Sequence, residues 1–309
     1  MTAALARFQR WLRGDGELTP FTISLQVGRS LLALGTLLTL VFNDDSVLFH
    51  SSSDEAPSAN CAQLGRFGAF CLFGDNLEGI RLAGIAVALL VMIGALPCVT
   101  SVAYWYVAAS VFANAKPVDG GDQITAVLAF MLMCASISDT RMNAWTRGVQ
   151  ASSLFIVPNV ILVFIPIQMA FVYLNAAVAK FSAPVWAEGS ALWYWFQHPG
   201  FNATPWAQEA ALTLLAHPWI SAFTTWGVLA LELGLAAALL FSSSTKSRMS
   251  WLVIGLAFHL CIALLMGLVS FGIAMGAGLW LSLRRARSHA SPGLLPIDQA
   301  VKILEKADA

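Results

Sequence analysis

Charged side chains are scarce in this sequence. Asp, Glu, Lys and Arg make up 11% of the 309 residues, whereas soluble domains contain about a quarter of such residues. Hydrophobic residues make up 58% of the chain, and the mean hydropathy is +0.72. This composition excludes a soluble globular domain and predicts an all-α, polytopic membrane protein.

An excess of basic residues is also lacking. Seventeen Lys and Arg residues balance 17 Asp and Glu residues, so nucleic acid is not expected as a partner. A cleavable signal peptide is not expected either, because residues 1–20 are polar and basic and the first apolar run is too long. We expect these residues to form a cytoplasmic amphipathic segment on the membrane surface.

Cysteine is rare, and no Cys-x-x-Cys motif is present among the five cysteines. Cys61 and Cys71 lie ten residues apart in a polar stretch at residues 43–79. Outside the cytoplasm, such a pair is typical of a disulfide. A catalytic redox pair is the less favoured alternative, because it would favour the missing spacing. The histidines before Pro199 and Pro218 are too far apart to favour a metal site, and we predict none.

The apolar runs predict about eight transmembrane helices. Six lie near residues 21–42, 80–97, 99–115, 123–139, 153–180 and 221–241, and a run at 250–283 is long enough to split into two near residues 267–272. Residues 181–220 contain no Lys or Arg but five of the 11 tryptophans. We expect them to form an interfacial or re-entrant segment between helices 5 and 6, with short helices near 186–197 and 206–217.

The basic residues set the expected orientation. With both termini inside, 12 of the 17 Lys and Arg residues fall in cytoplasmic pieces, as the positive-inside rule requires. We therefore predict a transmembrane domain at residues 21–285, a cytoplasmic tail at 286–309, and a location in the bacterial inner membrane.

Three polar side chains are expected at a similar depth in the membrane. Arg29, Glu232 and His259 each lie eight or nine residues from the cytoplasmic end of a predicted helix, and the helical rise per residue is constant. We predict an Arg29–Glu232 pair with His259 nearby. Either a polar clasp that holds helices together or a proton relay would explain such a cluster.

The stretch at residues 168–189 contains a lysine at the end of an apolar helix. Tyr173 and Lys180 lie seven residues apart and share a helix face, with Ala176 between them. The small side chain leaves room for a ligand. One interpretation is that the Lys180 side chain extends to the membrane surface. The other is that Lys180 belongs to a ligand site covered by the segment that contains Trp186.

Several ordered segments resemble a known family. VYLNAAVAKFSAPVWAEGSALWYW at 172–195 is similar to the Tyr-x3-Ala-x-x-Lys-x-Trp-x-x-Gly region of the HTTM family, the membrane domain of vitamin K-dependent gamma-carboxylases. Further segments are similar to the family and occur in the same order as in it: GDQI at 121–124, DTRMNAW at 139–145, LELG at 231–234 and FHLCIALLMGLVSFGIAM at 258–275. Within that family the chain most resembles the short bacterial SdpB-type, or sporulation-delaying-protein, branch.

The resemblance implies roles for particular residues. Lys180 would be a catalytic base, and Tyr173, Trp186 and His259 would line a pocket for a substrate or a reduced, vitamin K-like quinone. We also expect Asn175 and Glu188 in this pocket and His259 as a second catalytic residue. The chain departs from the carboxylases in three ways: Ala179 replaces a second lysine, the step from Lys180 to Trp186 is one residue longer, and the large extracytoplasmic domain is not matched. We therefore expect carboxylase-like base chemistry at Lys180 rather than carboxylation itself.

The resemblance also implies a pathway. SdpB-type proteins are linked to the maturation of secreted peptide toxins, so we expect a role in maturation or export of an antimicrobial peptide. The expected partners are the lipid bilayer, a secreted peptide precursor and a small accessory protein. The alternative is a transporter or immunity-type membrane protein without enzymatic activity.

Overall fold

A computed structural model describes residues 20–49, 57–116, 119–146, 156–198, 201 and 204–284. The predicted amphipathic N-terminus and the predicted tail lie outside these residues, apart from Pro20. The described residues are helical, without strands, as the composition predicted. The longer helices are α2 (Ile23–Phe42), α5 (Leu77–Met92), α6 (Pro97–Asn114), α7 (Gly120–Ser136), α8 (Ile156–Phe181), α12 (Pro218–Phe241), α13 (Thr245–Met266) and α14 (Val269–Leu283).

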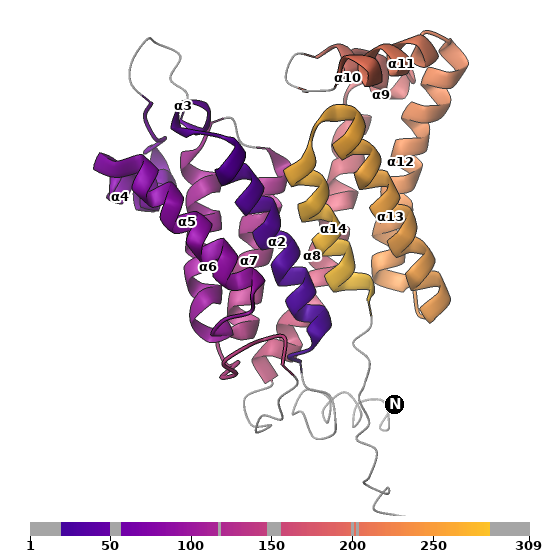
Figure 1. Cartoon of the computed structure of the whole chain (residues 1–309). Helices are drawn as coiled ribbons and strands as arrows, with labels where there is room; N and C mark the ends of the chain where they lie inside the picture. The colour runs from indigo at the N-terminus through magenta and orange to yellow at the C-terminus, as the bar shows by residue number, and fades with distance from the viewer. Residues whose placement is uncertain are drawn as a thin grey trace, which may run out of the picture.

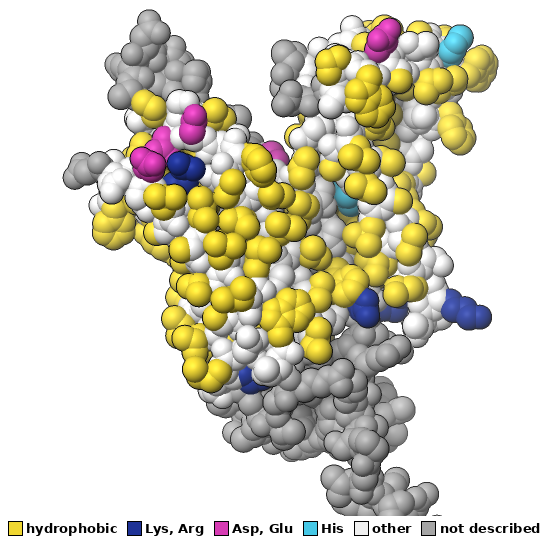
Figure 2. Space-filling view, in the orientation of Figure 1, with side chains coloured by type: hydrophobic (Ala, Val, Ile, Leu, Met, Phe, Trp, Pro, Cys, Tyr) yellow, Lys and Arg dark blue, Asp and Glu magenta, His cyan; other side chains and the backbone are white. Residues whose placement is uncertain are grey.

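Four of these helices are long and apolar enough to cross a membrane: α2, α8, α12 and α13. Helices α7 and α14 are apolar but shorter. Hydrophobic side chains cover much of the flank of the molecule (Figure 2), and many of them are exposed, such as Phe171, Phe223 and Phe241. Exposed apolar side chains along long helices are what a lipid environment stabilises. The protein is therefore a helical membrane protein.

Helix α14 lies in the middle of the bundle. It packs against α2 and α7 on one side and against α8 and α13 on the other, which Figure 1 shows in yellow between the two halves. Small residues allow this close approach. If Gly278 on α14 carried a Cβ atom, this atom would clash with the sulfur of Met169 on α8, at a distance of 2.5 Å. Small residues at helix contacts are typical of membrane bundles.

The predicted split of the last apolar run is confirmed. Helix α13 ends at Met266, and the capping residue Gly267 has a φ of 75° and a ψ of 8°. This left-handed conformation favours glycine at a helix end. The chain then reverses into α14, where a Cβ on Gly272 would lie 3.0 Å from the carbonyl oxygen of His259. The glycine therefore lets α14 pack closely beside His259.

The tryptophan-rich stretch forms three short helices: α9 (Pro184–Ala187), α10 (Ala191–Gln197) and α11 (Pro205–Leu215). They lie across one end of α8, α12 and α13, at the same end of the molecule as α3 (Asp45–Leu48) and α4 (Ala69–Leu72) (Figure 1). Proline begins α9 and α11, where its fixed φ suits the first helical turn. We call these three helices the roof.

The DTRMNAW motif at residues 139–145 forms hydrogen bonds with the end of helix α5. The indole nitrogen of Trp145 donates to the carbonyl oxygen of Met92 at 2.9 Å, and the Asn143 side chain donates to the carbonyl oxygen of Ile93 at 3.2 Å. Both acceptors lie at the end of α5. The motif therefore satisfies carbonyl groups that a helix end leaves without partners, which is a structural role.

The predicted disulfide between Cys61 and Cys71 is confirmed, with Cα atoms 5.7 Å apart. The loop that it closes is also held to α6, because the Asn114 side chain donates to the carbonyl oxygens of Asn60 at 3.0 Å and Gly65 at 2.8 Å. The disulfide and this amide therefore stabilise the same loop.

Replacing Cys61 and Cys71 together by serine is expected to lower the free energy of unfolding by about 2–3 kcal/mol, because the unfolded loop gains freedom. Thermal unfolding in detergent, with and without reductant, measures the change. Cys261→Ser is the control, since Cys261 is an exposed free thiol. Labelling of five thiols instead of three in unreduced, unfolded protein would contradict the disulfide.

Candidate functional site

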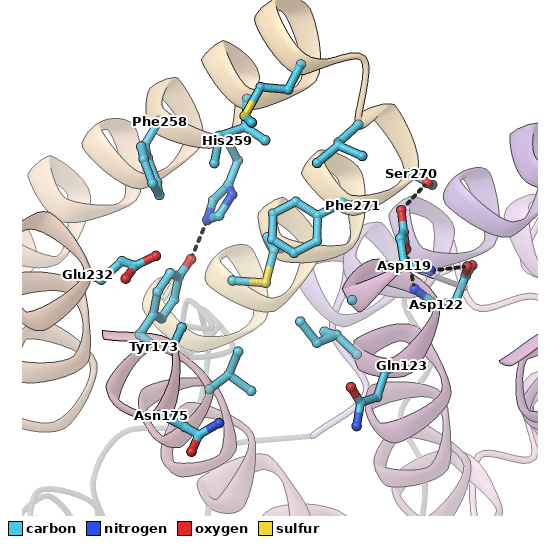
Figure 3. Close-up of a pocket in the computed structure, with 18 of the residues that line it drawn as sticks. Asp119, Asp122, Gln123, Tyr173, Asn175, Glu232, Phe258, His259, Ser270 and Phe271 are labelled. Carbon is cyan, nitrogen blue, oxygen red and sulfur yellow. Dashed lines mark hydrogen bonds between the residues drawn. The ribbon is translucent and has the colours of Figure 1, made fainter. Parts of the chain in front are cut away.

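A cavity of about 910 Å³ lies between α7, α8, α12, α13, α14 and the roof. Its walls are largely apolar, with Phe258 and Phe271 facing the interior (Figure 3). Six of the predicted site residues line this cavity: Tyr173, Asn175, Lys180, Trp186, Glu232 and His259. The seven-residue spacing on α8 therefore placed Tyr173 and Lys180 on one face, as predicted.

Lys180 is paired with a carboxylate on a neighbouring helix. Its Nζ donates to Glu232 Oε1 on α12 and forms an ion pair with it. The side chains of Lys180 and Glu232 are 16% and 8% exposed. In a low-dielectric surrounding, an ion pair of this kind is strong but costly to desolvate. Its presence at a cavity is thus consistent with a functional role.

The roof covers the ion pair with aromatic rings. The Lys180 nitrogen lies 5.2 Å from the ring centroid of Trp186, a separation at which a cation and an aromatic face attract. Trp186 is buried and meets Trp195 edge-on, with centroids 5.4 Å apart. Trp186 therefore takes the predicted position beside Lys180.

Tyr173 and His259 form the second polar contact of the site. The Tyr173 hydroxyl lies 2.7 Å from Nε2 of His259, and both side chains are buried (Figure 3). The His259 ring also packs against Phe258 and Phe271, with centroids 4.9 and 5.6 Å away. These contacts fix the imidazole at the wall of the cavity.

The predicted Arg29–Glu232 pair is wrong. The Arg29 guanidinium donates instead to Gln26 Oε1 at 3.1 Å and lies 3.4 Å from the Thr100 hydroxyl, while Glu232 binds Lys180. Helix α2 packs against α5, α7 and α14, whereas α12 packs against α8 and α13. The depth predicted from residue counting therefore did not identify the partner of Glu232.

The remaining predicted pocket residues are placed differently. Asn175 is exposed and lies at the edge of the cavity. Glu188 is exposed and is not among the cavity-lining residues, so the structure does not bring it to the site.

Two carboxylates at the start of α7 were missed by the sequence analysis. Asp119 and Asp122 cap this helix reciprocally, and the Ser270 hydroxyl donates to Asp119 at 3.1 Å. Both carboxylates line the cavity (Figure 3). Their three-residue spacing is the signal of a capping box, which sequence inspection could have found.

The fold and this site define a helical membrane protein with an ion pair and a Tyr–His contact in a partly open cavity. The chain is 34% identical over 276 residues to sporulation-delaying protein SdpB of Bacillus subtilis (strain 168), which covers 87% of this chain and 84% of that protein. It is 32% identical over 273 residues to the uncharacterized protein YitO of the same organism, covering 86% and 87%. The chain belongs to the SdpB family.

No protein-family model matches the chain, and no solved structure matches it. The membership therefore rests on these relatives.

Proposed function

We propose that the chain acts in maturation or export of a secreted antimicrobial peptide, with Lys180 and Glu232 as its working groups. The relative named sporulation-delaying protein SdpB supports the pathway. The observation that supports this site is the ion pair between the Lys180 amine and the Glu232 carboxylate at the wall of the cavity. We further propose a peptide precursor and a small accessory protein as partners.

The ion pair suggests how Lys180 would act as a base. An ammonium bonded to a carboxylate can pass its proton directly to that carboxylate, which leaves a neutral amine. The amine can then accept a proton from a group held in the cavity, and the Tyr173–His259 contact can orient that group. The low exposure of the Lys180 and Glu232 side chains strengthens the electrostatic interaction between them.

The carboxylase resemblance also implied a reduced quinone. The apolar walls, with Phe258, Phe271 and Met275, and the polar end at His259 suit a ring with polar substituents. Such a group would supply oxygen-dependent base chemistry when bound, but no step of the proposal depends on it.

We propose eight membrane spans with both termini in the cytoplasm. The eight longer helices contain 15–26 residues and run in a similar direction (Figure 1). Most basic side chains in view lie toward one end, and acidic ones gather toward the other (Figure 2). The disulfide lies at the acidic end, in keeping with an oxidising exterior. Helix α14 is short for a bilayer, so local thinning would accompany it.

Lys180→Ala is expected to reduce the secreted, processed peptide about a hundredfold or more, the usual size of a lost general base. Lys180→Arg is expected to fail as well, because a guanidinium keeps the ion pair but does not release its proton. Mass spectrometry of the culture medium measures the product. Lys246→Ala is the control, since Lys246 is exposed at the start of α13.

The Lys180→Arg variant distinguishes a role of Lys180 as a base from a role as a fixed positive charge. Normal secretion by Lys180→Arg would show that only the positive charge is needed, and normal secretion by both variants would remove the site from the pathway.

A transporter is the second candidate function, because a cavity of about 910 Å³ is large enough for a small ligand. Uptake of the mature peptide by vesicles that contain only this protein, undiminished in Lys180→Arg, would favour transport over chemistry.

A further inference from the structure

Two buried polar atoms at the cavity have no hydrogen-bond partner among the described residues: Oε2 of Glu232 and Nδ1 of His259. Glu232 is 6% exposed and His259 2% exposed, and both side chains line the cavity. A buried polar atom without a partner is costly and is usually satisfied by water or a ligand. The two atoms therefore mark where a ligand would place its polar groups.

The two atoms differ in type. Oε2 belongs to a carboxylate whose other oxygen accepts from Lys180, so it is an acceptor. The Tyr173 hydroxyl needs an acceptor for its proton, and Nε2 of His259 is the partner that the structure gives. With the phenol donating, the proton of the neutral imidazole lies on Nδ1, which makes this atom a donor. The ligand must therefore offer one donor and one acceptor.

We propose that the cavity binds an uncharged, apolar peptide segment through its backbone, with an N–H donating to Glu232 Oε2 and a C=O accepting from His259 Nδ1. This inference rests on the proposed function and names how its substrate is held. A residue in an extended chain turns its own N–H and C=O to the same side, as in an antiparallel pair. A lipid ester, by contrast, offers acceptors only.

Part of the cavity suits apolar side chains. Phe258, Phe271, Met266 and Met275 line it, and methionine adapts to side chains of different shape. Backbone hydrogen bonds would supply affinity that does not depend on sequence, while the apolar walls would select hydrophobic segments. Such a site would hold part of a hydrophobic precursor beside Lys180.

The test uses the purified full-length protein in lipid nanodiscs and two matched probes. N-acetyl-Leu-Leu-Leu-amide carries the backbone donors, and its analogue with methylated peptide nitrogens has the same apolar side chains without the internal N–H groups. Isothermal titration calorimetry is expected to show binding of the first probe and about tenfold weaker binding of the second, as for a lost hydrogen bond to a charged group. Equal affinity, or no binding of either probe, would overturn the inference.

Two variants at one position provide the matched control. His259→Gln places its amide near Nε2 and keeps a partner for Tyr173, so it loses only the group at Nδ1. His259→Asn places its amide near Nδ1 instead. We expect about tenfold weaker binding of the unmethylated probe to His259→Gln and a smaller loss for His259→Asn, which keeps a donor near Nδ1 but loses the contact with Tyr173. The reverse order would contradict the assigned role of Nδ1.

The probes in the wild-type protein decide the question even if a variant does not fold. Equal binding of both probes, with secretion still abolished in Lys180→Ala, would reject the backbone contact and leave the proposed function intact. Selective binding, with normal secretion in both Lys180 variants, would keep the binding site and reject the proposed function.

Discussion

Glu232→Leu is expected to lower the free energy of unfolding by about 3–5 kcal/mol, because it leaves the Lys180 ammonium without its carboxylate. The lysine side chain is only 16% exposed and lies under Trp186, so water cannot fully replace the lost partner. Thermal unfolding and titration with sodium dodecyl sulfate, both on protein in mild detergent, measure the loss. Secretion of the peptide is expected to fall with it.

The double variant Lys180→Met/Glu232→Leu separates stability from function. Replacing both charges by apolar side chains of similar size removes the desolvation cost together with the attraction. We therefore expect stability near the wild-type value, a coupling energy between the two sites of at least about 3 kcal/mol, and no processed peptide. A Glu232→Leu protein as stable as the wild type would show that the ion pair is solvated and that no sheltered site exists.

The local features of the site could be predicted from the sequence because they depend on one helix. Tyr173 and Lys180 face the same cavity since the helical repeat places residues seven apart on one side. The roof was predictable from its tryptophans, and the disulfide from two cysteines in a polar loop. Each of these inferences needed only neighbours along the chain.

The partner of Glu232 could not be predicted in the same way. Counting residues from a helix end gives depth in the membrane, but it gives no information about which helices lie side by side. Helix α14 separates α2 from the pair of α8 and α12, so Arg29 and Glu232 face different neighbours. The order of helices around a bundle depends on packing that one sequence does not reveal.

Arg29 instead belongs to a second charged cluster at the other end of the molecule. Asp139 binds Arg141 through both carboxylate oxygens, at 2.8 and 2.7 Å, and it is near enough to Arg29 to attract its charge. Asp139 is 1% exposed and Arg29 4% exposed. One carboxylate thus compensates two sheltered guanidinium groups, at the beginning of the DTRMNAW motif.

Asp139→Asn is therefore expected to destabilise the fold by about 3–5 kcal/mol, since it leaves two sheltered cations without an anion. Asp45→Asn is the matched control: the Asp45–Arg81 pair is more exposed, at 25% and 16%, and its loss is expected to cost about 1 kcal/mol or less. Unfolding in detergent under identical conditions compares the two. Equal losses would mean that water reaches Asp139, and the motif would then owe its role to the backbone contacts of Asn143 and Trp145.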